Sequence, residues 1–258
     1  MITLGGIIRR GRVAVLGPSM TVEADRFVTK YRKVLDATAR EADAFLADNC
    51  NSTMCEFLTA SKRLLDELSD RQARKFGREM DMYLPIHTMI YMLGRKLMPG
   101  KAVETGVEKG GSTYMLLKAM QANHTGHLWS VDKHKYWRYR GQVTACIGPL
   151  VTQDLKPRWT FIKANAQKRL SSILETVGEL DMFGALQGHT FAVQKHETEL
   201  AWPLLRSGGV FVLDRPDWND GKYLKSFLLA NGDEVSCHKT YPEGASNDTY
   251  EFTILIKK

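Results

Sequence analysis

The sequence predicts an α/β fold in which helices cover both faces of a mostly parallel sheet. Three observations support this prediction. From residue 101 onward, short apolar runs alternate with stretches whose apolar residues recur at helical spacing. Residues 102–117, AVETGVEKGGSTYMLL, pass from such a run through a glycine-rich turn into a helical pattern. The chain ends in two extended segments with no helix between them, which indicates an antiparallel hairpin at a sheet edge.

The composition is that of a globular protein. The chain has 258 residues, 43% of them hydrophobic and 25% charged, which is enough to bury a core without cross-links. Four cysteines are too few for a disulfide framework, and Cys50 and Cys55 have no second pair to complete a zinc site. We find no signal peptide and no apolar run near ~18 residues, so we expect a cytoplasmic protein without a membrane partner. The net charge of +7 favours anionic partners.

Residues 1–99 are predicted to form an N-terminal helical region. Apolar residues recur at helical intervals, with charges between them, in three segments: 23–48, 53–69 and 81–97. The third helix should stop at Pro99 and Gly100. This region is interpreted as a cap or as the interface of a homo-oligomer, and a helical layer packed on the next domain remains an open alternative.

Residues 100–258 are predicted to form the α/β domain. Strands are expected at 102–106, 127–132, 159–164, 180–186 and 209–214. Helices are expected between them at 112–123, 167–178 and 194–208. The two terminal extended segments are 233–240 and 249–258. Strands that alternate with helices in this way are typical of a doubly wound parallel sheet.

The glycine-rich turn fits neither of the two common phosphate-binding loops. A P-loop needs a lysine after its last glycine, and although Gly106 and Gly111 have the required separation, Ser112 stands in the lysine position. A dinucleotide loop needs a second glycine two residues after the first, and that position holds Glu108. An acid there would oppose a pyrophosphate.

S-adenosylmethionine is the nucleotide that suits this turn, because it has no phosphate and carries an ammonium and a sulfonium. Glu104 ends the first strand and could face the ammonium. Asp132 ends the next strand 21 residues after Gly111, near the interval at which an acid receives ribose hydroxyls. The alternative is that Gly110 and Gly111 only permit a tight turn between strand and helix.

Four segments resemble successive motifs of class I S-adenosylmethionine-dependent methyltransferases: VETGVEKGGST, WSVDK, IKANA and AWPLLRSGGVFVLDRPDWND. The first resembles the branch that holds small-molecule O-methyltransferases and cephalosporin-hydroxylase-like proteins. The resemblance spans roughly residues 100–258 and implies a Rossmann-like fold with S-adenosylmethionine as cofactor. The cofactor-binding residues that it implies are Glu104 and Gly106 at the methionine portion, Ser112 at its carboxylate, Asp132 at the ribose and Asn165 near the adenine. Gly110 of the glycine-rich turn is also predicted to bind the cofactor.

The chain departs from the related O-methyltransferases where they often hold a divalent metal. Leu186 and Gly188 stand where acids would follow the fourth strand, and the fifth strand ends in Asp214 and Arg215 instead of two acids. We therefore predict no catalytic metal. His189 is the candidate general base, because histidine ordinarily titrates near neutral pH, and Asp214 would orient it or the substrate.

Simple structural roles for this pair stay open: a helix cap near Thr190 for His189 and a strand-end turn for Asp214.

Three functions remain open from the sequence. The first is O-methylation of a small-molecule acceptor, such as a sugar or secondary metabolite. The second is methylation of RNA, suggested by the net charge and by residues 132–140, DKHKYWRYR, whose basic and aromatic side chains suit phosphates and stacked bases. A basic helix is the alternative interpretation of that segment. The third is a non-catalytic scaffold that binds S-adenosylmethionine.

Overall fold

The computed structural model describes residues 53–76, 84–134, 136–139, 142–215, 222–231, 235–240 and 252–258. Its centre is a seven-stranded sheet in the order β5-β2-β1-β6-β7-β9-β8. The parallel strands are β1 (Lys101–Thr105), β2 (His127–Asp132), β5 (Trp159–Lys163), β6 (Leu180–Ala185) and β7 (Leu205–Asp214). The antiparallel strands are β8 (Val235–Thr240) and β9 (Phe252–Lys257). The predicted fold class is confirmed, including the terminal hairpin.

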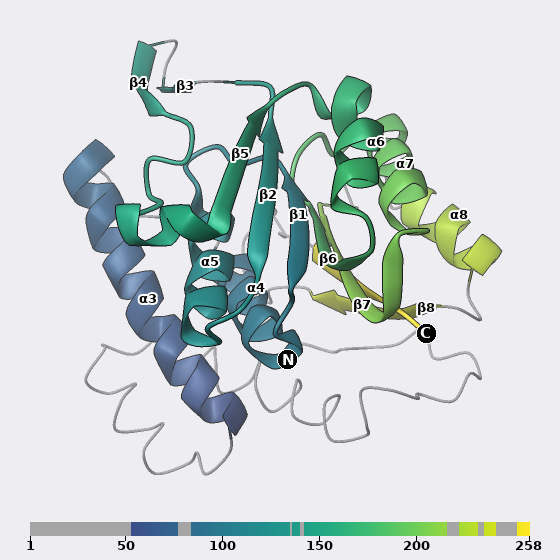
Figure 1. Cartoon of the computed structure of the whole chain (residues 1–258), viewed down its shortest axis with the longest axis horizontal. Coiled ribbons are helices and arrows are strands. Elements are labelled where there is room, and N and C mark those ends of the chain that lie inside the picture. Colours follow the sequence, from purple (N-terminus) through teal and green to yellow (C-terminus); the bar gives the residue numbers. More distant parts are fainter. Residues whose placement is uncertain are drawn as a thin grey trace.

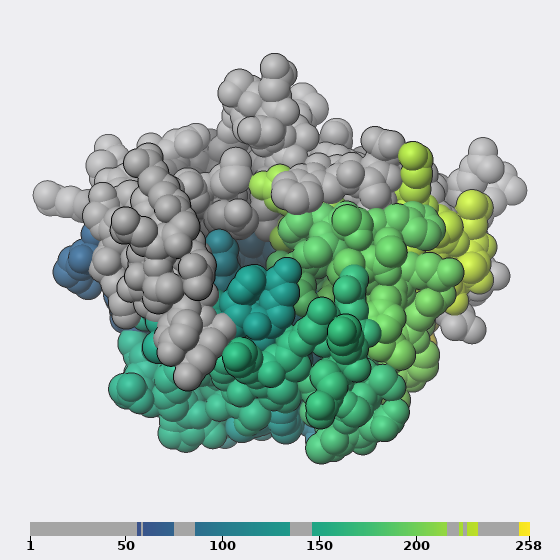
Figure 2. All heavy atoms as spheres, turned by 90° about the horizontal axis from the view of Figure 1, so that it is seen from above, coloured from purple at the N-terminus to yellow at the C-terminus, as the bar shows by residue number. Residues whose placement is uncertain are grey.

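Strand order reverses beside β1. The chain moves outward from β1 through β2 to β5 on one side, and from β6 to β7 on the other. In open sheets of this kind, the carboxyl ends of the strands at such a reversal form a crevice. Figure 2 looks onto this edge of the sheet, where teal atoms of the β1–β2 part lie next to green atoms of the part that includes β6 and β7.

Helices cover both faces of the sheet (Figure 1). One face carries α3 (Thr53–Phe76), α4 (Leu84–Leu97) and α5 (Gly111–Ala122). The other carries α6 (Ala166–Val177), α7 (Phe191–Ala201) and α8 (Lys222–Asn231). A short 3-10 helix, η1 (Gln153–Arg158), precedes β5. No described helix is long and apolar enough to cross a membrane.

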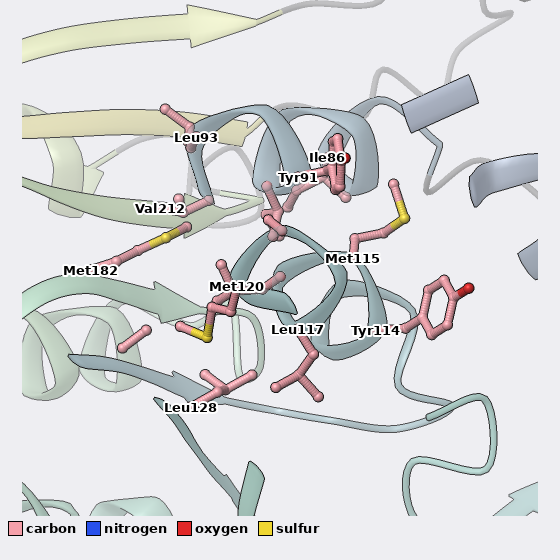
Figure 3. Packing of buried hydrophobic residues seen from close by; sticks show 14 of the residues in the cluster. Ile86, Tyr91, Leu93, Tyr114, Met115, Leu117, Met120, Leu128, Met182 and Val212 are labelled. Carbon is pink, nitrogen blue, oxygen red and sulfur yellow. The ribbon is translucent and has the colours of Figure 1, made fainter. Parts of the chain in front are cut away.

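Helix α5 is the centre of the first face's core. It lies between the sheet and α4, so side chains all around it are buried, including Met115, Leu117 and Met120. Figure 3 shows these residues between Leu128 of β2 and Ile86 of α4. A helix that is buried on every side has a mostly apolar sequence without a clear polar face. The STYMLLKAM run has such a sequence. The same cluster includes Phe57, Leu65 and Leu68 of α3, so α3 and α4 pack on the α/β layer.

Several predicted boundaries need correction. The helix predicted at 194–208 ends at Ala201, and β7 begins at Leu205, where it pairs with Leu180. Leu204 and Leu205 continue the apolar helical spacing of α7, but Leu205 pairs with Leu180 of β6 and so belongs to the sheet. The alternative of a basic helix within 132–140 is wrong, because β3 (Tyr136–Tyr139) and β4 (Gln142–Cys146) form an antiparallel hairpin. Helix α8 was not predicted, and the segment 23–48 lies outside the described residues.

Candidate functional site

A cavity of about 530 Å³ lies at the carboxyl edge of the sheet. The turns after β1, β2, β5, β6 and β7 all contribute to its wall, and α3 and α4 add Gln72, Ile86 and His87. Its volume falls within the range of roughly 300–1,000 Å³ typical of small-molecule sites. Six predicted site residues line this cavity: Gly106, Ser112, Asp132, Asn165, His189 and Asp214. Glu104 and Gly110 are not part of its lining.

The turn between β1 and α5 needs Gly110 for two reasons. Gly110 is the N-cap of α5 with φ 90°, a left-handed conformation that costs glycine little. A Cβ at this position would also lie 2.9 Å from the Cα of Gly148. Gly110 therefore permits the tight turn between β1 and α5, which is the structural role considered for it as an alternative. Other residues of the turn, such as Gly106 and Ser112, line the cavity.

Glu104 lies beneath the cavity and points toward α5 and β2. Its carboxyl accepts hydrogen bonds from the hydroxyls of Ser130 (2.7 Å) and Thr113 (2.5 Å), and the Ser112 hydroxyl lies 3.5 Å away. Trp159 Nε1 in turn donates to Ser130 Oγ at 2.7 Å. Burial raises the pKa of Glu104 to about 7, against the opposing effect of these hydroxyls. The side chain therefore acts as an anchor for the first turn of α5 in this structure.

Asp132 joins the turns after β1 and β2. Its Oδ2 accepts backbone hydrogen bonds from Val107 (3.0 Å) and Glu108 (3.3 Å), and its Oδ1 accepts one from His134 (2.8 Å). The side chain is buried yet lines the cavity. A carboxylate offers about four acceptor positions, so three backbone donors leave room for a ligand hydroxyl. Asp132 thus shapes the site and keeps capacity to bind in it.

Ser112 and Asn165 lie where helices begin. Ser112 is in the first turn of α5 and lines the cavity. Asn165 is the N-cap of α6, and its side chain accepts a hydrogen bond from the backbone of Gln167 at 3.0 Å. Asn165 also lines the cavity. Asn165 therefore caps α6 and is at the same time part of the cavity wall.

His189 and Asp214 meet at the cavity wall after β6 and β7. His189 Nδ1 lies 3.3 Å from the backbone oxygen of Asp214, and Nε2 lies 3.9 Å from its Oδ2. A carbonyl oxygen only accepts, so this hydrogen bond selects the tautomer that carries its proton on Nδ1. Nε2 is then the ring atom able to take a proton. The helix-cap alternative for His189 does not hold, because Thr190 is the N-cap of α7.

Other groups hold the pair in place. Gln194 of α7 donates to the backbone oxygens of Asp214 and Arg215, both at 3.2 Å. Arg215 has φ 44°, a left-handed conformation that is uncommon for a residue with a side chain. The strand end is thus turned sharply at the cavity and tied to α7.

A second buried acid, Glu197 of α7, lies beside Thr105 of β1 and beside Gln187, which lines the cavity. Its side chain is fully buried, and burial raises its pKa to about 8, with Thr105 and Gln187 exerting the smaller, opposing effect. No hydrogen bond of standard geometry reaches either carboxyl oxygen among the described residues. Gln187 lines the cavity and packs closely on Gly106: a Cβ added at Gly106 would lie only 2.7 Å from the Cβ of Gln187.

Within the described ranges, no three His, Cys, Asp or Glu side chains gather as metal ligands would.

The sequence did not point to Gln72, His87, Gln187, Gln194 or Glu197. Gln187 and Gln194 lie in the GALQGHTFAVQKHE run, in which only the positions of the expected acids and His189 were considered from the sequence. Gln72 and His87 come from helices that carry no motif, and only the packing of α3 and α4 brings them to the cavity.

Part of this chain matches the model of one protein family, and its fold is similar to that of solved structures. Residues 103–215 match the family model described as a methyltransferase domain. No curated protein matches the chain in sequence. The O-methyltransferase TomG from Streptomyces achromogenes, solved in complex with S-adenosylmethionine, superposes with a TM-score of 0.53 at 16% identity, over 75% of this chain and 89% of that one.

An O-methyltransferase from Bacillus cereus in complex with S-adenosylhomocysteine gives a TM-score of 0.52 at 13% identity, over 84% of this chain and 97% of that one. At these identities the likeness establishes a shared fold.

Proposed function

We propose that the chain is an S-adenosylmethionine-dependent methyltransferase that methylates a hydroxyl group of a small molecule, such as a sugar or secondary metabolite, without a catalytic metal. The methyltransferase-domain match at residues 103–215 supports methyl transfer and indicates the cofactor. The observation that carries the reaction type is the His189–Asp214 pair, which lines the same cavity as the glycine turn.

The residues of the cavity suit this cofactor. The first turn of α5 presents backbone N–H groups, which favour a carboxylate such as that of the methionine portion. Asp132 retains acceptor capacity for ribose hydroxyls, and Asn165 lies at the next strand end, where the adenine would reach. S-adenosylmethionine supplies a methyl group that its sulfonium already activates. What the protein must add is alignment of the acceptor oxygen and removal of its proton.

His189 has the geometry for removing that proton. Its Nδ1 is held by the Asp214 backbone, so Nε2 takes the proton of an acceptor hydroxyl. Once protonated, the imidazolium lies 3.9 Å from the Asp214 carboxylate, which stabilises the new positive charge. Gln194 keeps the Asp214 backbone in place while the charge changes.

The donor set of the cavity supports a mechanism without metal. Among the residues that line the cavity, the carboxylates belong to Glu108, Asp132 and Asp214. Asp132 already accepts three backbone hydrogen bonds, and Asp214 is followed by Arg215. Hard divalent cations need several oxygen ligands that converge on one point, and the described part of the chain brings no three His, Cys, Asp or Glu side chains together in that way.

The test is a methyl-transfer assay that follows S-adenosylhomocysteine formation with a panel of hydroxylated small molecules. Each reaction is run with EDTA and with magnesium. The proposal expects an acceptor whose turnover is the same in both conditions and is lost in His189→Ala. Turnover that EDTA abolishes would contradict the metal-free scheme. Cofactor binding without turnover on any acceptor would favour the non-catalytic scaffold.

RNA is a second candidate substrate because of the β3–β4 hairpin. The hairpin is a separate two-stranded sheet that follows β2 directly, and Figure 1 places it apart from the main sheet. Lys133 and His134, just before it, are exposed and line the cavity. Binding to a single-stranded RNA that weakens steeply with salt would favour this candidate. Absence of such binding at low salt would leave the small-molecule proposal.

A further inference from the structure

Helix α4 brings a histidine into contact with the glycine turn. His87 is largely buried, with 7% of its surface exposed, and it lines the cavity. Gly111 is the first residue of α5, and a Cβ there would lie 2.6 Å from His87 Nε2 and 2.8 Å from Cε1. Gly111 is not among the residues with positive φ. Glycine is therefore required at this position because of the imidazole ring and not because of the backbone conformation.

The surroundings of His87 favour a polar contact with an anion. The first turn of α5 presents N–H groups that attract negative charge. Lys109, whose charge acts on His87, and Ser112, which follows Gly111, also line the cavity. Burial, and secondarily the charge of Lys109, lower the pKa of His87 to about 3. The imidazole is therefore neutral at physiological pH. A neutral imidazole carries one N–H donor.

S-adenosylmethionine has one anionic group, the carboxylate of its amino-acid portion. The helix terminus, Lys109 and the His87 ring together form the part of the cavity that suits this group. The other end of the cofactor, with its ribose and adenine, matches Asp132 and Asn165 at neighbouring strand ends. The contact of His87 with Gly111 thus lies at the amino-acid end of the site.

We propose that His87 is a cofactor-binding residue, whose imidazole N–H donates a hydrogen bond to the amino-acid carboxylate of S-adenosylmethionine at the first turn of α5. The inference rests on the proposed function and extends it to α4, a helix in which no methyltransferase motif lies. It predicts that ligands with the amino-acid portion depend on His87 and that ligands without it do not.

The experiment compares two ligands by calorimetry: S-adenosylhomocysteine, which has the carboxylate, and methylthioadenosine, which lacks the amino-acid portion. His87→Phe keeps a ring against Gly111 but removes the N–H, and His124→Asn is the control at an exposed histidine between α5 and β2. We expect His87→Phe to bind S-adenosylhomocysteine about tenfold more weakly. Its affinity for methylthioadenosine and its thermal midpoint should stay near those of the unmodified protein.

Equal weakening toward both ligands would overturn the inference, because His87 would then only support the wall. Unchanged affinity for S-adenosylhomocysteine would overturn it as well. If the unmodified chain binds neither ligand, both the proposed function and this inference fail. This result differs from the two above, in which the unmodified chain binds and only the role of His87 is wrong.

A second pair of variants tests the contact on which the inference depends. Gly111→Ala alone should lower the thermal midpoint and weaken S-adenosylhomocysteine binding, because the added Cβ collides with the imidazole. In the His87→Ala background the same change should have almost no effect on the thermal midpoint, since the ring is gone. Additive effects of the two substitutions would contradict the contact between His87 and Gly111.

Discussion

Replacing Glu197 by glutamine should change how the stability of the protein depends on pH. The Glu197 carboxyl is fully buried, and its pKa is raised from 4.5 to about 8, chiefly by burial. A carboxyl whose pKa is higher in the folded chain than in the unfolded one stabilises the fold while it is protonated. Its contribution is complete below pH 4.5 and is lost as the pH rises toward about 8. Glutamine has a similar shape and does not titrate.

The magnitude follows from the width of that window. Between the two pKa values the unfolded chain releases a proton that the folded chain keeps, so stability falls by about 1.4 kcal/mol per pH unit. From pH 5 to pH 7 the unmodified protein should therefore lose about 3 kcal/mol relative to Glu197→Gln. The assay is urea unfolding at several pH values, with the change in the free energy of unfolding compared between the two proteins.

Glu199→Gln is the matched control, because Glu199 lies on the same helix with its side chain 62% exposed. Its stability profile should run parallel to that of the unmodified protein. If the profile of Glu197→Gln also ran parallel to that of the unmodified protein over this range, Glu197 would titrate alike in the folded and unfolded chains, and its raised pKa would be wrong.

Three further substitutions test the site. Asp132→Asn should weaken S-adenosylmethionine binding about tenfold, because an amide replaces a carboxylate that accepts from the glycine turn; unchanged affinity in a calorimetric titration would remove the ribose assignment. His189→Asn should lower turnover by about 100-fold or more while the cofactor affinity stays near normal, and equal activity would exclude His189 as the base. Trp159→Phe should reduce the free energy of unfolding by about 1–2 kcal/mol, because Ser130 loses the indole donor at 2.7 Å. An unaltered urea midpoint would show that this hydrogen bond contributes no net stability.

The sheet could be predicted because buried parallel strands appear as short apolar runs between turns. The prediction for β2, 127–132, matches the structure residue for residue. The end of α7 could not be predicted in the same way. Leu204 and Leu205 continue its apolar spacing, and only the pairing of Leu205 with Leu180 shows that Leu205 begins β7. In residues 136–146 the basic and aromatic side chains are compatible with a helix or with a hairpin, so the local sequence pattern could not distinguish the two structures.

The part of the site at the strand ends could be predicted because the carboxyl ends of parallel strands converge. Asp132, His189 and Asp214 line the cavity for this reason. The direction of Glu104 was harder to predict, because its hydroxyl partners Thr113 and Ser130 come from two other elements. His87 could not be found at all, since its place depends on how α4 packs against α5, which no local pattern encodes.

The measurement to make first is a calorimetric titration of the unmodified chain with S-adenosylmethionine, once with EDTA and once with magnesium. We expect micromolar binding with the same affinity in both conditions. Binding that requires magnesium would contradict the metal-free site. No binding in either condition would contradict the assignment of the cavity to S-adenosylmethionine.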